Sequence, residues 1–517
     1  MEKNGNTERV EIRAAARAIR IHTLDTVAVA LEPLAKGCTV TIGGIRITCT
    51  DDIPSGHKLA LKDIARDEKV IKYGTPIGKA PQAIVAGAHV HTHNLRTLLA
   101  ETPEYRWTQP RITPPPRSAA APEIDVFKRG DGRIGIRNEV WIVPTVGCVN
   151  RTAESLASWA NREFADRNIG GVFAWTHPYG CSQMGDDHEA TCAVLADLVK
   201  HPNAGAVLVL SLGCESNTPE RFKEILGEYA EDTERIRFLV TQESEDEIAD
   251  GKRLLGELVS YAEQMKRRKA PISALVVGMK CGGSDGLSGI TANALVGQMC
   301  DMLTGMGASV ILTEVPEMFG AEQMLMDRCE TPEIFDKTVR LINDFKDYFR
   351  ANNQTVYENP SPGNKAGGIS TLEDKSCGCV QKGGKAIVRG VYRYGEQLPR
   401  SAKGLVLLEG PGNDIVSTTA MTAAGAHLIL FTTGRGTPLG APVPTIKIAS
   451  NTPLALKKPA WIDFDAGKLL FENFENADSL REELFRLILD TINGRILTKN
   501  ELNNYREIAI FKNGVIL

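Results

Sequence analysis

Four cysteines lie beside glycines, at points where apolar, strand-like runs give way to loops. They are Cys148 in VPTVGCVN, Cys181 in HPYGCSQ, Cys214 in VLVLSLGCESN and Cys281 in VVGMKCGGSD. In a parallel α/β sheet the carboxyl ends of the strands share one edge, so thiols from distant stretches of sequence can converge on one crevice. Thiolates are suitable ligands for iron, and a neighbouring glycine lets the backbone approach a bound group closely. The pattern therefore predicts a thiolate metal site, against the alternative that small cysteines simply pack at strand ends.

Three histidines alternate in the segment HVHTHN, and a fourth precedes another apolar run. His89, His91 and His93 fall on one face if their segment is extended, and His57 in SGHKLAL can join the same site. Imidazoles bind iron or zinc, and neutral histidine also serves as a base near pH 7. The alternatives are a polar strand edge, or one functional histidine with two solvated neighbours.

Glycine-rich loops and arginines indicate where an anionic substrate binds. EGPGNDIVST at 409–418 and TTGRGTPLG at 432–440 each follow a strand-like run, and Arg435 in the second can hold a carboxylate through two hydrogen bonds. Neither loop matches a P-loop or a dinucleotide fingerprint, so a small carboxylate is favoured over a nucleotide. Further candidates for substrate binding are Asp285, which follows Cys281, and Arg137 with Asn138 in GDGRIGIRNEVW.

Composition restricts the class of protein. The chain has 517 residues, 42% hydrophobic and 24% charged, which is typical of a globular enzyme with about three domains. A net charge of −4 argues against a nucleic-acid partner. Without a secretion signal or a run of about 18 apolar residues, we expect no membrane partner and a cytoplasmic location. The 11 cysteines are then expected to be reduced thiols or metal ligands.

The pattern along the chain predicts a modular organisation. Residues 1–17 read as an extension, 18–95 as a small mostly-β domain of short alternating strands, and 96–123, with ITPPPRSAAAPE, as a linker. After residue 124, apolar strands alternate with segments of helical period, which is typical of α/β architecture with mostly parallel sheets and flanking helices. We divide this region into 124–385 and 386–517.

Long ordered blocks resemble the altronate/galactarate dehydratase family from Ala18 to Leu517. They are GHKLAL, IKYGTPIG, HVHTHN, IRNEVWIVPTVGCVN, YGCSQMGDDH, HPNAGAVLVLSLGCE, KCGGSDGLSGITAN, LTEVPEMFGAEQ, ENPSPGNKAGG and FTTGRGTPLGAPVPTIKIA. The resemblance implies an amino-terminal β-clip domain of the SAF type and dependence on Fe²⁺, with Mn²⁺ sometimes substituting. The first 17 residues depart from the family pattern, and Cys377 is an extra cysteine beside the family-like Cys379.

The implied reaction removes water from D-altronate to give 2-dehydro-3-deoxy-D-gluconate, a step in galacturonate catabolism. Abstracting the hydrogen on carbon 2, next to a carboxylate, builds a dianionic enediolate that a cation must stabilise, and hydroxide leaving carbon 3 needs a proton donor or a Lewis acid. The alternatives are a dehydratase of another sugar acid such as galactarate, and a noncatalytic sugar-acid binding protein. A homo-oligomer is compatible with each.

Two forms of the iron site remain open. In one, a single Fe²⁺ is held by histidines and carboxylates. In the other, an iron–sulfur cluster is held by three of five cysteines, namely Cys148, Cys181, Cys214, Cys281 and Cys379. We favour the cysteines as metal ligands and His57, His89, His91 and His93 for proton transfer, with the first domain closing over the sheet edge.

Overall fold

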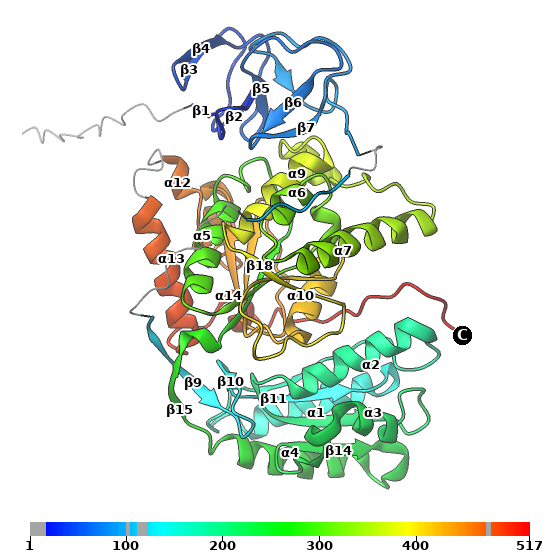
Figure 1. Ribbon diagram of the computed structural model, residues 1–517. Coiled ribbons are helices and arrows are strands. Elements are labelled where there is room, and N and C mark those ends of the chain that lie inside the picture. Colours follow the sequence, from blue (N-terminus) through cyan, green and yellow to red (C-terminus); the bar gives the residue numbers. More distant parts are fainter. Residues whose placement is uncertain (1–16, 100–103, 111–120, 472–476) are drawn as a thin grey trace, which may run out of the picture.

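A computed structural model describes residues 17–99, 104–110, 121–471 and 477–517 (Figure 1). The predicted extension 1–17 lies outside the described residues except for Arg17, and so does part of the predicted linker 96–123. A small β domain lies at one end of the molecule, a large α/β domain in the middle, and a second α/β domain at the other end. This architecture confirms the predicted fold class.

The amino-terminal domain is built from short antiparallel strands. One sheet has the order β1-β2-β5-β8, and two hairpins, β3–β4 and β6–β7, complete the domain. The strands are β1 (Ala18–Ile19), β2 (Val27–Ala30), β3 (Thr39–Ile42), β4 (Ile45–Thr48), β5 (Lys58–Ala60), β6 (Lys69–Lys72), β7 (Thr75–Lys79) and β8 (His89–Val90).

The second domain contains a four-stranded parallel sheet with the order β12-β11-β13-β14. Continuous apolar runs such as AGAVLVLS form its strands because helices cover both faces of the sheet. The strands are β11 (Glu139–Pro144), β12 (Val172–Ala174), β13 (Ala204–Ser211) and β14 (Ile236–Val240), and the helices are α1 (Asn150–Glu163), α2 (Gly185–Lys200), α3 (Pro219–Leu226) and α4 (Glu247–Ala262). A separate antiparallel sheet, β10-β9-β15, joins it to the large domain; its strands are β9 (Glu123–Lys128), β10 (Ile134–Gly135) and β15 (Arg267–Pro271).

The large domain is built on a seven-stranded parallel sheet with the order β18-β19-β17-β16-β20-β21-β22. Its strands are β16 (Val276–Cys281), β17 (Ser309–Leu312), β18 (Val388–Tyr392), β19 (Gly404–Leu408), β20 (Leu428–Thr433), β21 (Thr445–Ala449) and β22 (Phe464–Asp465). Its helices are α5 (Ala292–Gly305), α6 (Glu322–Met326), α7 (Pro332–Ala351), α8 (Pro362–Ala366), α9 (Leu372–Cys379), α10 (Asp414–Ala423), α11 (Thr452–Lys457), α12 (Lys468–Phe471), α13 (Ala477–Ile492) and α14 (Lys499–Leu502).

The division expected at residue 386 falls inside this sheet. Strands β16 and β17 precede residue 386 and pair with β19 and β20, which follow it. The boundary between sheets lies instead between β14 and β16. Sequence pattern identifies strands but not their neighbours, and strand pairing decides which segments share a domain.

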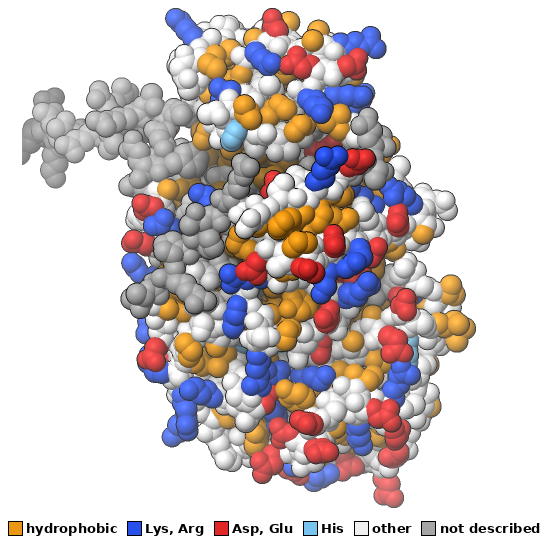
Figure 2. Space-filling model, in the orientation of Figure 1, with side chains coloured by type: hydrophobic (Ala, Val, Ile, Leu, Met, Phe, Trp, Pro, Cys, Tyr) orange, Lys and Arg blue, Asp and Glu red, His pale blue; other side chains and the backbone are white. Residues whose placement is uncertain are grey.

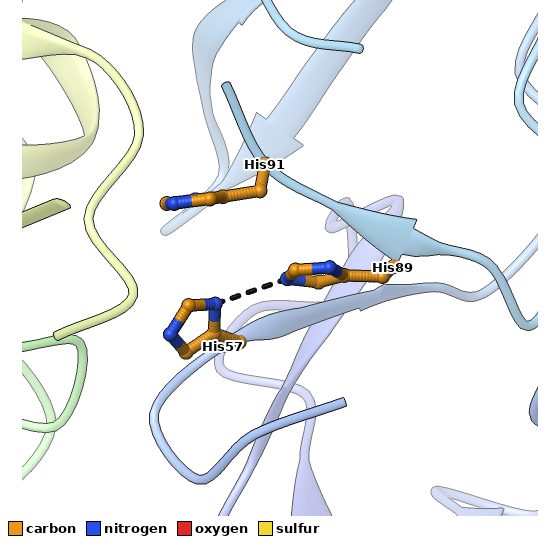
Figure 3. A group of neighbouring side chains, drawn as sticks. All are labelled: His57, His89 and His91. Carbon is orange, nitrogen blue, oxygen red and sulfur yellow. Dashed lines mark hydrogen bonds between the residues drawn. The ribbon is translucent and has the colours of Figure 1, made fainter. Parts of the chain in front are cut away.

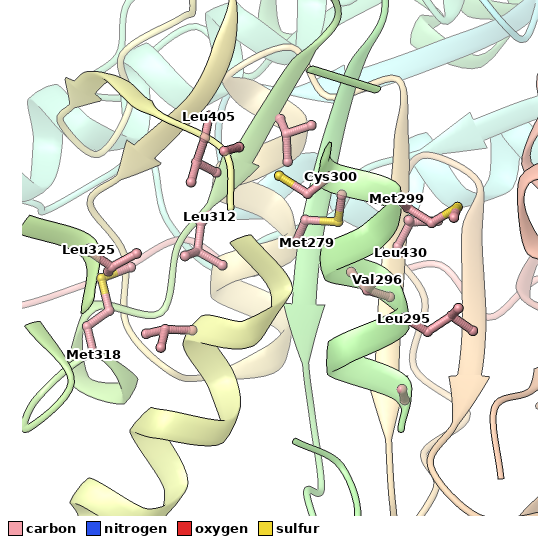
Figure 4. Close-up of a cluster of buried hydrophobic side chains, with 14 of the residues drawn as sticks. Met279, Leu295, Val296, Met299, Cys300, Leu312, Met318, Leu325, Leu405 and Leu430 are labelled. Carbon is pink, nitrogen blue, oxygen red and sulfur yellow. The ribbon is translucent and has the colours of Figure 1, made fainter. Parts of the chain in front are cut away.

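The main core lies between the seven-stranded sheet and its helices. Figure 4 shows Met279 of β16 beside Cys300 of α5, in a buried cluster that also contains Leu312 of β17 and Met299 of α5. Cys300 is fully buried there. No helix among the described residues has the length and apolar character needed to cross a membrane. On the face in Figure 2, acidic and basic side chains are interspersed.

Candidate active site

Three of the four predicted histidines come together in the amino-terminal domain (Figure 3). His57 precedes β5, His89 lies in the neighbouring strand β8, and His91 follows β8, so pairing of the two strands places the rings side by side. His57 Nδ1 lies 3.0 Å from His89 Nε2, and one ligand atom from each ring lies within 4.8 Å of the other two. Among the described residues, His57, His89 and His91 form the group whose ligand atoms lie close enough together to hold one metal ion.

The surroundings favour the neutral form of these imidazoles. Burial first, and then the neighbouring Lys58 and histidines, lower the pKa of His89 to about 4 and of His91 to about 3. Burial also lowers the pKa of His57. Near pH 7 the three imidazole rings are therefore neutral, and each has a ring nitrogen whose lone pair can bind a cation. His93 is exposed, and its ring centroid lies 5.5 Å from that of His89, so it stands beside the trio rather than in it.

A cleft of about 370 Å³ separates the amino-terminal domain from the large domain. Ser55 and Gly56 line its upper wall, immediately before His57 in the sequence. His57 Nε2 lies 3.4 Å from the carbonyl oxygen of Ala366, which also lines the cleft. The histidine trio is therefore next to the cleft.

The opposite wall is the carboxyl edge of three adjacent strands. Asp285 follows β16, Arg435 follows β20 and Asn451 follows β21, and all three line the cleft. This is the edge at which open α/β sheets bind ligands. Two of the predicted substrate-binding residues, Asp285 and Arg435, thus line the cleft, and the Arg435 side chain is exposed. Their contact with substrate stays a prediction.

Asp285 is held by a dense set of donors. Its carboxylate accepts hydrogen bonds from Ser450 Oγ at 2.9 Å, Asn451 Nδ2 at 3.0 Å and Ser288 Oγ at 2.8 Å. Burial raises the pKa of Asp285, while these hydrogen bonds oppose the shift. A Cβ atom at Gly434 would lie 2.4 Å from Asp285 Cγ, which explains why the loop after β20 carries glycine there.

A buried ion cluster fixes the amino-terminal domain on helix α9. Asp374 pairs with Lys58 at 2.8 Å and with Lys72 at 2.9 Å, and Lys58 also donates to the carbonyl oxygen of Gly368 at 2.7 Å. Burial by itself would raise the pKa of Asp374, but the two lysines lower it well below its usual range. Sequence reasoning missed these residues, although a lysine inside the apolar strand KLA is a signal of a buried partner.

Cys281 and Cys379 lie in the large domain, below the cleft. A cavity of about 10 Å³ is lined by Asp285, Lys375 and Cys379. Cys379 Sγ lies 3.0 Å from Glu317 Oε2, and a hydrogen bond to Cys379 holds the pKa of Cys281 well below its usual range. Both thiols are buried, 1% and 4% exposed.

The other three predicted cysteine ligands lie elsewhere. Cys148, Cys181 and Cys214 are exposed and follow strands of the four-stranded sheet. Cys281 therefore does not share a sheet edge with these three cysteines, because its strand belongs to the other parallel sheet. Their binding of metal stays a prediction.

Arg137 and Asn138 also lie away from the cleft. Arg137 is 5% exposed and pairs with Glu501 at 2.6 Å, and Asn138 is 4% exposed and donates to the carbonyl oxygen of Ala262 at 2.8 Å. The prediction that they contact substrate is not supported by this placement. Both side chains instead join segments that are distant in sequence. A polar residue before a strand can have this structural role as readily as it can bind a ligand.

Taken as a class, the molecule is a modular α/β protein in which a β-clip domain covers a polar, histidine-flanked cleft at a parallel-sheet edge. Three family models match consecutive parts of the chain: the altronate/galactarate dehydratase SAF domain over 16–98, the D-galactarate dehydratase/altronate hydrolase second domain over 126–263, and the D-galactarate/altronate dehydratase C-terminal domain over 272–516. The chain belongs to the altronate/galactarate dehydratase family.

Similar proteins cover almost the whole chain. An altronate dehydratase of Escherichia coli (strain K12) is 51% identical over 96% of this chain and 99% of its own length. An altronate dehydratase of Bacillus subtilis (strain 168) is 49% identical over 96% of this chain and 99% of its own. A galactarate dehydratase (L-threo-forming) of Escherichia coli (strain K12) is 30% identical over 97% of this chain and 98% of its own.

Proposed function

We propose that this protein is a hydro-lyase that converts D-altronate to 2-dehydro-3-deoxy-D-gluconate in galacturonate catabolism. The observation that carries the proposal is the full-length identity of about one half to two altronate dehydratases, against 30% to a galactarate dehydratase. We place the reaction in the cytoplasm, with a small sugar acid as the partner, no nucleic-acid partner and a homo-oligomer as a compatible assembly.

The cleft supplies the groups that bind a sugar acid. Arg435 is positioned to hold the substrate carboxylate, since guanidinium binds carboxylate through two parallel hydrogen bonds. Asp285 is a half-buried carboxylate that lines the cleft, and we assign it the removal of the proton from carbon 2. Its raised pKa makes it a stronger base than an ordinary aspartate.

The histidine trio fits a bound Fe²⁺, with Mn²⁺ as a substitute. Three neutral imidazoles with ligand atoms within 4.8 Å of one another match the donor preference of these cations. When bound there, the cation supplies Lewis-acid stabilisation of negative charge on the substrate. His57, His89 and His91 would hold it. His91 Nδ1 lies 3.0 Å from Ser370 Oγ of the large domain, so this contact orients one ring and joins the two domains.

The rest of the site orients the substrate and excludes water. Ser55 and Gly56 cover the cleft from the amino-terminal side, opposite Asp285 and Arg435. The ion cluster of Lys58, Lys72 and Asp374 keeps this cover in place.

The decisive experiment compares turnover of D-altronate, D-galactarate and D-mannonate by full-length protein prepared without oxygen and supplied with Fe²⁺. We expect keto-deoxy acid to form selectively from D-altronate, and His89→Ala to abolish the activity. Preference for D-galactarate would replace this proposal with galactarate dehydration. Binding of an acid without turnover, in protein with a full complement of iron, would support a noncatalytic binding protein.

A further inference from the structure

Three exposed thiols lie on adjacent loops at the edge of the second domain, away from the cleft. Cys148 follows β11, Cys181 follows β12 and Cys214 follows β13, and β11 lies between the other two strands in the parallel sheet. The three loops therefore emerge from the same carboxyl edge. In Figure 1 this domain and the amino-terminal domain lie at opposite ends of the molecule.

The first two loops are fixed against each other. The backbone N–H of Gly147 donates to the carbonyl oxygen of Tyr179 at 2.8 Å. A Cβ at Gly180 would lie 2.0 Å from the carbonyl oxygen of Thr145. Gly180, with a φ of +98°, is thus required for this approach. The backbones of the two loops that carry Cys148 and Cys181 are therefore held in contact directly before these residues.

The third loop is held by a buried carboxylate. Glu215 is 2% exposed and accepts hydrogen bonds from Thr145 Oγ1 at 2.7 Å and from the backbone N–H of Gly213 at 2.6 Å. The backbone N–H of Asn217 donates to the carbonyl oxygen of Gly180 at 3.3 Å. The loop that carries Cys214 is therefore joined to both of the others.

The spacing of the thiols suits a polynuclear centre. Neighbouring strands in a sheet lie about 4.8 Å apart, so cysteines after three adjacent strands are spread over roughly twice that distance. The three thiols do not form a group with all ligand atoms within 4.8 Å of one another. A single metal ion needs ligand atoms that lie this close together. An iron–sulfur cluster does not, because each thiolate binds a different iron atom.

Buried amide donors lie on the same loops. Gln183, 5% exposed, follows Cys181 by two residues, and Asn217, fully buried, follows Cys214 by three. Among the described residues, Gln183 Nε2 and Asn217 Nδ2 have no hydrogen-bond partner. Unpaired buried donors cost stability, and hydrogen bonds to cluster sulfurs are a recognised means of stabilising and tuning such centres.

We propose that Cys148, Cys181 and Cys214 bind an iron–sulfur cluster through three thiolates, leaving one iron without a cysteine ligand. The cluster takes up ferrous and ferric iron in equal parts together with sulfide, so its assembly needs no electron transfer, and the three thiols release their protons as the iron–sulfur bonds form. This centre is separate from the histidine trio, and its existence does not depend on the reaction assigned to the cleft.

The experiment measures iron and acid-labile sulfide in full-length protein reconstituted without oxygen with ferrous iron, ferric iron and sulfide. We expect sulfide in the parent protein and a fall of at least about tenfold in Cys148→Ser, Cys181→Ser and Cys214→Ser, since even changes around a metal site cost this much in affinity. Cys38→Ser, in the amino-terminal domain, is the matched control and should keep the sulfide. His57→Ala should lose the iron bound at the histidine trio but keep the sulfide and the iron of the cluster.

Circular dichroism and thermal unfolding of each variant separate loss of the centre from loss of the fold. A parent protein without sulfide, or one that binds a single zinc ion at the three thiols, would overturn the proposal. Sulfide retained in all three cysteine variants would do the same.

Discussion

Lys58 and Asp374, 316 residues apart, form an ion pair of 2.8 Å in which both side chains are fully buried. The pair joins β5 of the amino-terminal domain to α9 of the large domain. Lys58 directly follows His57, so the contact that holds the domains together also fixes the position of a candidate metal ligand.

Asp374→Ala should destabilise the protein strongly. The substitution leaves Lys58 and Lys72 buried without their counter-charge, and removing one partner of a buried pair costs about 3–5 kcal/mol. Denaturant unfolding measures the change in free energy. Asp347→Ala is the control, because it breaks an exposed pair with Arg350 and should cost about 0–1 kcal/mol. Equal effects of the two substitutions would contradict a special role for the buried cluster.

His89→Ala should lower the affinity for Fe²⁺ at least about tenfold, because it removes one of three converging ligands. His93→Ala is the matched control, since His93 is exposed and stands outside the trio. Calorimetric titration with Fe²⁺ under nitrogen gives both affinities, ideally in a Cys148→Ser background that removes the competing thiol site. The same affinity for Fe²⁺ in both histidine variants would show that the cation binds at another site.

Arg435→Ala should reduce kcat/KM for the sugar acid roughly 10- to 100-fold, mainly through KM, because charge-assisted hydrogen bonds contribute about 1.5–3 kcal/mol. Steady-state kinetics with metal-saturated enzyme measures the effect. Lys457→Ala removes an exposed positive charge on the nearby helix α11 and should leave KM unchanged. An Arg435→Ala variant with the KM of the parent protein would contradict a contact between Arg435 and the substrate carboxylate.

Asn451→Ala should move the acid limb of the pH profile of kcat/KM to higher pH. Asp285 acts in its ionised form, so activity falls as the pH drops through its pKa. Burial raises that pKa and the hydrogen bond from Asn451 lowers it, so removing the donor raises it further.

Thr452→Ala, which also changes the cleft wall, is the control for this shift. Iron content must be recorded at each pH, so that loss of metal is not mistaken for protonation of Asp285. An acid limb that stays in place in Asn451→Ala would exclude Asp285 as the titrating base.

Local pattern identified several parts of the site. Alternation in HVHTHN placed His89 and His91 on one side of the chain, and glycine-rich strand ends marked Arg435 and Asp285. Both predictions rest on short-range rules, strand period and turn geometry, that hold wherever the strand lies in the fold.

The sequence by itself determined the class of fold, the small β domain and the chemical types of the candidate ligands. Tertiary structure decided which of these residues meet. His57 joins His89 because β5 pairs with β8, and the cysteines divide because β11 and β16 belong to different sheets. Arg137 binds Glu501 and Lys58 binds Asp374, each across more than 300 residues. Such pairings depend on strand neighbours and domain packing, which are set by contacts distant in sequence and leave no periodic signal in the chain.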